Sequence, residues 1–344
     1  MISVALFNNK GGVGKTTLTY HLAHMLQRLG HRVLAVDLDP QSNLTAAFLD
    51  EDELSEVWHE SEQSDWPLLE HQQKLLFRVD GSGTVASAVE PIMRGLGDVL
   101  LSDPVTITDG LWLVPGDLNL SAFEDKLSAA WPNSLIGDHA ALRTTTAFYR
   151  LILDAGRRVK ADIALIDVGP NLGAINRAAL LAADTVLMPL AADLFSLRGL
   201  RNLGPALRDW RRIWRTNVLQ HVPEDIAAPA GTMTPLGYVV MQPKMRLDRP
   251  VKAYQRWLDR VPAVFANAVV EHALDDEKSY EIATLRNYQS LMPLAHDARR
   301  PMFDLRSADG ALGSTQSLVQ RCYQDFEALS EKLLQRLHDI PPAR

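Results

Sequence analysis

Cysteine is almost absent from this sequence, because Cys322 is the one thiol among 344 residues. A single cysteine excludes a disulfide framework within the chain and an iron–sulfur cluster held by several of its own thiolates. We expect Cys322 to be an inert residue buried in the last helix. The sequence also has no run of eighteen apolar residues and no apolar leader segment at its start, so we expect a cytoplasmic protein.

Positive charge is missing from one long stretch of the chain. Between Asp37 and Gln73 there are eleven acids and no Lys or Arg, with Trp58 and Trp66 among them. Such a charge run is usually a solvated face or a loop, and the alternative is an acidic segment that docks a protein partner. The whole chain carries a formal charge of −7 and is 47% hydrophobic, which is enough for a large core.

A phosphate-binding loop stands near the start of the chain. The residues Asn8, Asn9, Lys10, Gly11, Gly12, Val13, Gly14, Lys15, Thr16 and Thr17 lie between an apolar run and a helix-like stretch. Glycines let successive backbone N–H groups point at an anion, and the following helix adds the positive end of its dipole. Lys15 is placed to neutralise the β- and γ-phosphates of a nucleotide, and the Thr16 hydroxyl to bind Mg²⁺.

The loop departs from the common pattern at its first position. The pattern G-x-x-x-x-G-K-[ST] requires glycine where this chain has Asn9, and a second lysine, Lys10, follows at once. Lys10 is too early in the loop to duplicate Lys15 on the same phosphates. Its charge is therefore available for another contact.

Three aspartates follow apolar runs that are typical of buried parallel strands. Asp37 and Asp39 come at the end of residues 32–37, and Asp167 comes at the end of 161–168. Carboxyl ends of strands are where open α/β sheets bind ligands, and Mg²⁺ prefers oxygen ligands. We therefore interpret Asp167 as a Walker B acid, although aspartates at strand ends can also serve only to form turns.

These motifs together resemble the ParA/MinD family of deviant Walker-type ATPases, most closely its ParA branch. The resemblance implies ATP and Mg²⁺ as cofactors, and it assigns residues Lys10–Thr17 to nucleotide binding. It gives Lys10 a contact with the phosphates of a partner subunit in an ATP-bound dimer. It implies that Asp39 orients the attacking water. It also implies that Asp37 supports the Mg²⁺ shell, to which Thr16 and Asp167 contribute. The family pattern D-x-P-P becomes Asp167-Val168-Gly169-Pro170 here, so Gly169 replaces a proline.

The remaining pattern alternates strands and helices, which predicts an α/β fold: a doubly wound, mostly parallel P-loop sheet with helices on both faces. We expect one domain over 1–344 with an acidic insertion at about 50–105 and a C-terminal helix at about 312–338. Strands are expected at 2–7, 32–37, 111–115 (as a central strand), 161–168, 184–190, 235–241 and 282–287. The last of them is a candidate to frame an adenine. Helices are expected at 16–29, 85–101, 120–130, 141–158, 174–182, 196–215 and 249–266.

A basic stretch contrasts with the acidic one. Between Arg198 and Arg260 there are twelve Lys or Arg and five Asp or Glu. A stripe of this kind can bind duplex DNA without reading its sequence. The alternative is that the long arginine side chains cover apolar surface around Trp210 and Trp214. The ParA resemblance favours DNA contacts by Arg208, Arg211, Arg212, Arg215, Arg246, Arg249 and Lys252.

The expected function is an ATPase that forms a homodimer on ATP, binds DNA nonspecifically and partitions or positions a plasmid, chromosome or protein cargo on the nucleoid. A ParB-like or other partner protein would stimulate hydrolysis. Membrane binding by the C-terminal helix is not favoured, because acids are mixed with bases on it. The alternatives are an ATP-driven switch subunit of a defence or conjugation system and a small-molecule P-loop synthase.

Overall fold

Eight strands form one sheet in the order β3-β4-β2-β5-β1-β6-β7-β8. The computed structural model describes residues 1–58, 83–241, 251–270, 280–288, 290–311 and 313–340, without the side chains of 251–254. The strands are β1 (Ile2–Leu6), β2 (Val33–Asp37), β3 (Val105–Thr108), β4 (Leu111–Val114), β5 (Ile163–Asp167), β6 (Thr185–Ala191), β7 (Thr234–Met241) and β8 (Glu281–Leu285). All neighbouring pairs are parallel except β3 and β4. This is the predicted mostly parallel α/β fold.

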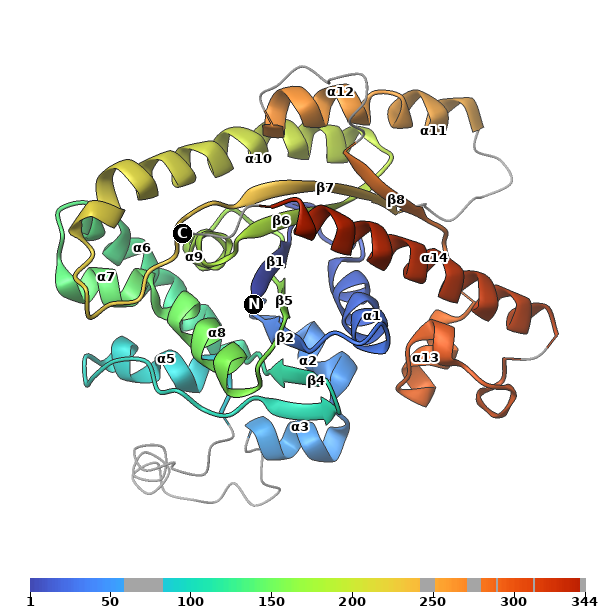
Figure 1. The fold of residues 1–344 in the computed structure, drawn as a ribbon, viewed down its shortest axis with the longest axis horizontal. Helices are drawn as coiled ribbons and strands as arrows, with labels where there is room; N and C mark the ends of the chain where they lie inside the picture. The colour runs from blue at the N-terminus through green and yellow to red at the C-terminus, as the bar shows by residue number, and fades with distance from the viewer. Residues whose placement is uncertain (59–82, 242–250, 271–279, 289, 312, 341–344) are drawn as a thin grey trace.

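Helices cover both faces of this sheet, as Figure 1 shows for α10 and α14 on opposite sides of β7. The helices are α1 (Lys15–Arg28), α2 (Asn43–Phe48), α3 (Glu51–Trp58), α5 (Val85–Arg94), α6 (Phe123–Ser134), α7 (His139–Thr145), α8 (Ala147–Arg158), α9 (Ala174–Ala182), α10 (Leu194–Ile213), α11 (Val251–Leu258), α12 (Val261–Phe265), α13 (Met292–Ala298) and α14 (Ser314–His338). None of the helices in the described ranges is both long and apolar enough to cross a bilayer.

The alternation of side chains along the strands divides the core into two main layers. Ala5 of β1 packs into the cluster formed with α5 to α10, whereas Val4 and Leu6 pack into the cluster formed with α1 and α14. Successive strand residues point to opposite faces, so a strand covered on both faces must be apolar throughout. Cys322 of α14 is fully buried in the second cluster, which confirms its predicted place in the core.

The register of the central strands brings their polar ends together. Leu6 of β1 and Asp37 of β2 are both register partners of Asp167 on β5. The loops after these three strands therefore leave the sheet side by side, at the carboxyl ends of the strands. The site described below lies at these strand ends.

The structure differs from the sequence prediction in several elements. The helix expected over 85–101 ends at Arg94, because Gly95 adopts a positive φ of 69° and stops it. The segment expected over 141–158 is two helices that meet at Thr146, and the segment expected over 249–266 divides into α11, α12 and a π-helical turn. The predicted central strand, β4, lies second from the edge of the sheet. The edge strand β3 was missed because only four residues form it, and they alternate between half-buried and exposed.

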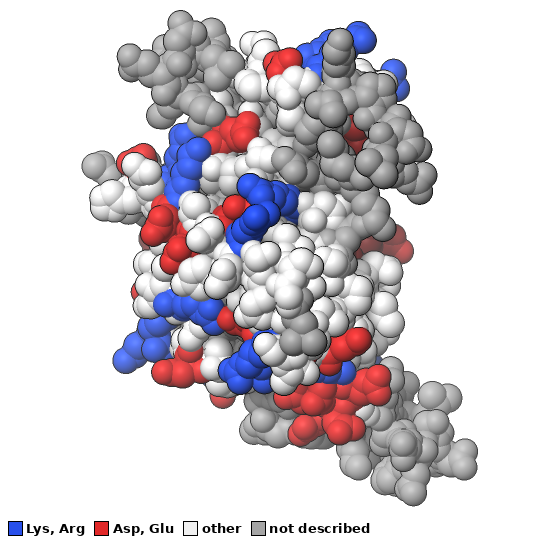
Figure 2. Space-filling model, turned by 90° about the vertical axis from the view of Figure 1, so that its right-hand side faces the viewer, with Lys and Arg blue, Asp and Glu red and all other residues white. Residues whose placement is uncertain are grey.

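The described part of the acidic stretch, residues 37–58, ends in the short helix α3. Its residues Glu51, Asp52, Glu53 and Glu56 are exposed, and Figure 2 shows acidic side chains gathered at the lower end of one face of the molecule. Trp58 donates its indole N–H to the carbonyl of Gly116 over 3.0 Å. Trp58 therefore attaches α3 to the loop after β4, whereas Trp66 lies outside the described residues.

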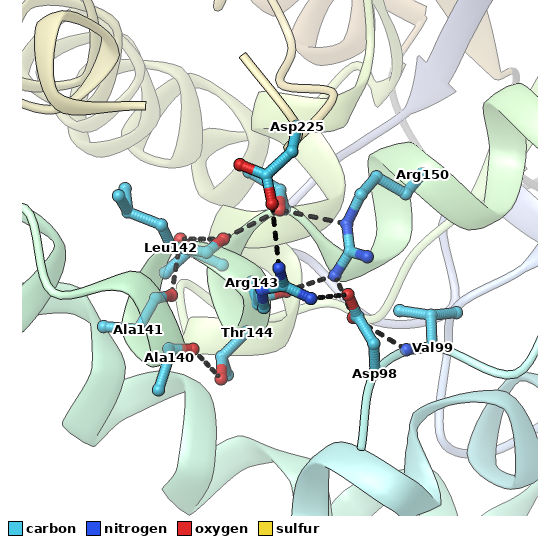
Figure 3. A network of polar contacts seen from close by, with 11 residues as sticks. Asp98, Val99, Ala140, Ala141, Leu142, Arg143, Thr144, Arg150 and Asp225 are labelled. Atoms are coloured by element: carbon cyan, nitrogen blue, oxygen red, sulfur yellow. Dashed lines mark hydrogen bonds and ion pairs between the residues drawn. The ribbon is translucent and has the colours of Figure 1, made fainter. Parts of the chain in front are cut away.

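An ion-pair network fastens the helices of one layer to each other (Figure 3). Arg143 of α7 contacts Asp98 at 2.8 Å and Asp225 at 2.9 Å, and Arg150 of α8 contacts the other oxygen of Asp98 at 2.7 Å. Arg150 also donates to the carbonyl of Arg143. The network thus joins the loop after α5, the α7–α8 corner and the loop before β7.

Candidate nucleotide site

The phosphate loop has the backbone geometry that its glycines predict. Gly12 and Gly14 adopt φ of 69° and 95°, a region that residues with a Cβ atom rarely occupy. At Gly14 an added Cβ would also lie 3.2 Å from the Cε atom of Met241. The loop turns at these two positions, and α1 begins directly after it at Lys15. The N-terminus of α1 therefore faces the loop, as an anion site requires.

Asp167 contacts two hydroxyl groups, one from the phosphate loop and one from α1. Thr16 donates to Oδ2 of Asp167 at 2.6 Å, and Thr19 approaches Oδ1 at 3.5 Å. Asp167 has no exposed surface, and its burial, followed by the nearby carboxylate of Asp37, raises its pKa. A cation that binds beside a buried carboxyl group with a raised pKa stabilises its anionic form.

Asp37 and Asp39 differ in what their carboxylates bind. Asp37 accepts from the backbone N–H and hydroxyl of Thr45, both at 2.8 Å, and burial raises its pKa to about 6. Asp39 is 7% exposed, accepts from the Gln41 N–H at 3.0 Å, and lines the cavity beside the phosphate loop. Asp37 is thus held by the chain itself, whereas Asp39 faces the space where a ligand would lie.

The residues present fit a magnesium site of the kind that includes a nucleotide. Thr16 and Asp167 supply a hydroxyl and a carboxylate side by side, and no group of three or more His, Cys, Asp or Glu in the described part of the chain could hold a metal alone. Mg²⁺ commonly takes one or two protein oxygens and completes its shell with waters and substrate phosphates. The donor set therefore suits Mg²⁺ that arrives with phosphates.

Lys15 is a cation in a crowded environment. It is 7% exposed, and burial lowers its pKa while the charges of Asp167 and Asp39 oppose that shift. A phosphate group would give this ammonium a partner in addition to the two acids. Lys15 lines the cavity beside Asp39 and the glycines of the loop.

A cavity of about 800 Å³ opens beside the phosphate loop. Its lining includes residues 10–18 and Asp39, together with Met241, at the end of β7, and residues 285–288, which begin at the last residue of β8. The volume is in the range of small-molecule and cofactor sites. The strand end that the sequence suggested for an adenine thus faces the same cavity as the phosphate loop.

Lys10 lies at the rim of this cavity and forms an ion pair with Asp193. Asp193 is the N-cap residue of α10, where its other oxygen accepts from the Ser196 N–H at 2.8 Å. Asn8 donates to the carbonyl of Pro189 on β6 at 2.7 Å and accepts from the Lys10 N–H. The start of the loop is therefore attached to the β6–α10 unit, which the sequence did not reveal.

A family model described as an AAA domain matches residues 1–218 of this chain. The chain belongs to this family. Chromosome-partitioning ATPase Soj from Thermus thermophilus is 30% identical over 212 residues, which are 60% of this chain and 62% of that protein. The resemblance to the ParA/MinD ATPases is thereby confirmed. The chain spans about half the length of the curated relatives that it matches.

Solved structures share the fold of this AAA-domain chain over nearly its whole length. A Corynebacterium diphtheriae protein has a TM-score of 0.69 at 22% identity, over 98% of this chain and 99% of that one. McdA from Cyanothece, in a complex with ATP, has a TM-score of 0.60 at 18% identity, over 100% and 99% of the two chains. At these identities the likeness concerns the fold.

Two residues of the AAA-domain chain that sequence reasoning missed hold the loop after Asp167. Asn176 donates its amide to the carbonyls of Gly169 and Asn171, at 2.9 and 2.8 Å. Glu124 of α6 accepts from the first two N–H groups of α9, at 2.6 and 2.9 Å. Asn176 lies near the start of a predicted helix, where such residues bind loop carbonyls, but nothing in the sequence signals the long-range contact of Glu124.

The seven basic residues predicted to contact DNA are in different environments. Arg212 and Arg215 are exposed, and Arg212 contacts Asp209 at 3.2 Å. Arg211 is half-buried, and Arg208 donates to the carbonyl of Ala268 in the π-helical turn Ala266–Val270. Arg246 and Arg249 lie outside the described residues, as does the side chain of Lys252 on α11. Trp214 is fully buried and stacks on Trp131, and Trp210 is half-buried.

Proposed function

We propose that this chain is a ParA-like ATPase that binds ATP with Mg²⁺, forms a homodimer in that state, and retains duplex DNA without sequence preference. Hydrolysis dissociates the dimer and releases the DNA. This cycle partitions or positions a plasmid, chromosome or protein cargo. The proposed place of action is the cytoplasm, on the nucleoid. The observation that carries the proposal is one cavity lined by Lys10, Lys15, Thr16 and Asp39, in which Thr16 also donates to the buried carboxylate of Asp167.

Each of these residues has a proposed part in the reaction. Residues 11–17 hold the phosphates by backbone N–H groups, and Lys15 neutralises their charge. Asp39, with a carboxylate facing the cavity, orients the attacking water. Thr16 and Asp167 hold Mg²⁺, and Asp37 supports them indirectly by fixing the neighbouring strand end. Bound Mg²⁺ would neutralise charge that develops on the phosphates.

DNA retention is proposed for the exposed arginines of α10 and the helices beside it. Arg198, Arg201, Arg212 and Arg215 of this region are exposed, as are Arg256 and Arg260 of the segment that begins with α11. The π-helical turn after α12 packs against α10, and α10, α11 and α12 lie at one end of the molecule in Figure 1. Neutralisation of phosphates by such side chains supplies nonspecific affinity and makes it depend on salt.

The decisive experiment is a salt titration of binding to a random-sequence duplex, with and without a nonhydrolysable ATP analogue. We expect retention with the analogue, a steep loss of affinity with salt, and weak retention without it. Equal DNA affinity in both states would contradict the proposal. ATP turnover that depends on a small carboxylic acid would favour a P-loop synthase instead.

A second candidate function is an ATP-driven switch that acts on a protein through the acidic stretch. It is favoured by one contact, because Trp58 ties α3 to Gly116, where an added Cβ would lie 2.8 Å from the Cγ atom of Asp37. A change at this strand end can therefore reach α3. Trp58→Ala tests the candidate: it should weaken binding of a stimulating partner, ParB-like or other, while ATP binding stays unchanged.

A further inference from the structure

The first three residues of the deviant loop are all attached to one neighbouring unit. Asn8 is bound to Pro189 on β6, and Lys10 is paired with Asp193 at the start of α10. Asn9 lies against Gly199 of α10, where an added Cβ would overlap the Oδ1 atom of Asn9. The loop and α10 therefore touch at the helix cap and again six residues later.

The Lys10–Asp193 pair is accessible to exchange. The two side chains are 32% and 35% exposed, and both residues line the nucleotide cavity. Lys10 carries one positive charge, so an incoming phosphate competes with the carboxylate of Asp193 for the same ammonium group. No rearrangement of buried groups is needed for Lys10 to leave.

Asp193 keeps favourable contacts when Lys10 leaves. Its carboxylate accepts from the Ser196 N–H at the N-terminus of α10, where a negative charge is stabilised by the helix dipole. Burial alone would raise the pKa of Asp193, and the hydrogen bonds from Lys10 and Ser196 lower it below its ordinary value. Asp193 therefore remains a competent acceptor that can hold Lys10 reversibly.

We propose that Asp193 is a positioning residue that holds Lys10 within its own subunit until a nucleotide-bound partner takes the lysine, and that this exchange is transmitted to α10. The inference rests on the proposed function, because it requires the ATP-dependent dimer. In this proposal Asp193 disfavours dimerisation, because it competes with the partner's nucleotide for Lys10. It also links the phosphate loop directly to the helix that carries Arg212 at its far end.

The test is Asp193→Asn, which removes the charge and retains a good N-cap residue. The matched control is Asp138→Asn at the N-cap of α7, where Asp138 accepts from the Ala141 N–H and caps the helix. Dimerisation of both variants and the wild type is measured by sedimentation over a range of concentrations of the nonhydrolysable ATP analogue. DNA retention is measured over the same range, to find the analogue concentration at which it reaches half of its maximum.

We expect Asp193→Asn to dimerise about three-fold more tightly than the wild type, which is the scale of a partly exposed ion pair. The control should match the wild type. DNA retention by Asp193→Asn should reach half of its maximum at a correspondingly lower analogue concentration. A purely structural role of Asp193 predicts the opposite sign, a weaker dimer and a lower melting temperature.

The two proposals fail in distinguishable ways. If the wild type dimerises and Asp193→Asn does so equally or less well, the role of Asp193 is overturned while the proposed function stands. If the dimer tightens and DNA retention does not follow, the transmission to α10 is overturned. If the wild type stays monomeric at saturating analogue, the proposed function fails, and this inference fails with it.

Discussion

The hydroxyl of Thr16 donates to Oδ2 of Asp167 over 2.6 Å, and this contact joins the first turn of α1 to the carboxyl end of β5. The two residues are 151 positions apart in the chain. They meet because β1 and β5 are neighbours in register, with Leu6 opposite Asp167. The hydroxyl of Thr16, which lines the cavity, and the buried carboxylate of Asp167 are oxygen donors of the kind that Mg²⁺ prefers.

Asp167→Asn should make nucleotide binding largely independent of Mg²⁺. The amide keeps the size of the side chain but lacks the negative charge that stabilises a cation, so affinity in Mg²⁺ should fall about ten-fold or more. Affinity in EDTA should change little. Calorimetric titration with the ATP analogue in both buffers measures this. Asp154→Asn, an acid on α8 that pairs with Arg158, serves as the control, and an equal loss in both buffers would contradict the assignment.

Asp39→Ala should trap the ATP-bound dimer. Asp39 faces the cavity and Asp37 does not, so loss of its carboxylate should slow hydrolysis about a hundred-fold while ATP still binds. Size-exclusion chromatography after incubation with ATP should show a persistent dimer for the variant. Glu56→Ala, on the exposed face of α3, should turn over ATP like the wild type. A variant that dissociates at the wild-type rate would rule out a water-orienting role.

Arg212→Glu together with Arg215→Glu should weaken DNA retention without a change in ATP affinity. Each phosphate contact contributes about 0.9 to the slope of log affinity against log salt, so two lost contacts should reduce the slope by about 1.8. Fluorescence anisotropy with a labelled duplex at several salt concentrations gives this slope. Arg306→Glu together with Arg321→Glu places equal charge on exposed residues near and on α14, across the sheet from α10. An unchanged slope in the first pair would exclude α10 as the DNA surface.

Asp98→Asn should lower stability at neutral pH and remove part of its dependence on acid. Burial raises the pKa of Asp98, and Arg150 and Arg143 outweigh this effect, so the pKa lies below its ordinary value. An acid whose folded pKa is lowered contributes stability above its unfolded pKa, near 3.9, and loses it as pH falls further. Because the pair is partly exposed to solvent, the contribution is about 1 kcal/mol.

Thermal unfolding at pH 7 and at a lower pH of about 2 measures this contribution. The wild type and Asp98→Asn should differ at pH 7 and converge only at the lower pH, after the pH has fallen through the lowered pKa of Asp98. Asp103→Asn is the control, because Asp103 pairs with Arg158 in a more exposed setting, with 69% of its side chain in solvent. A difference between wild type and Asp98→Asn that persists at the lower pH would show that packing, and not charge, is responsible.

The sequence was sufficient for the elements that have strong local signals. The strands that end at Asp37 and Asp167 are continuous apolar runs because helices cover both sides of the sheet, and such runs are recognisable without a structure. The positive φ of Gly12 and Gly14 follows from the loop motif in the same way. The edge strand β3 and the break at Thr146 lack such signals, since four half-exposed residues and a one-residue interruption leave the surrounding pattern almost unchanged.

The sequence by itself determined that this chain has a phosphate loop, strand-end acids and an alternating α/β order, because each depends on residues that are close together along the chain. Only the tertiary structure decided which distant groups meet: Lys10 with Asp193, Glu124 with the start of α9, and Trp58 with Gly116. It also decided that Arg208 turns toward Ala268 while Arg212 and Arg215 face solvent. Such pairings depend on strand order and helix packing, and no local spacing in the sequence specifies them.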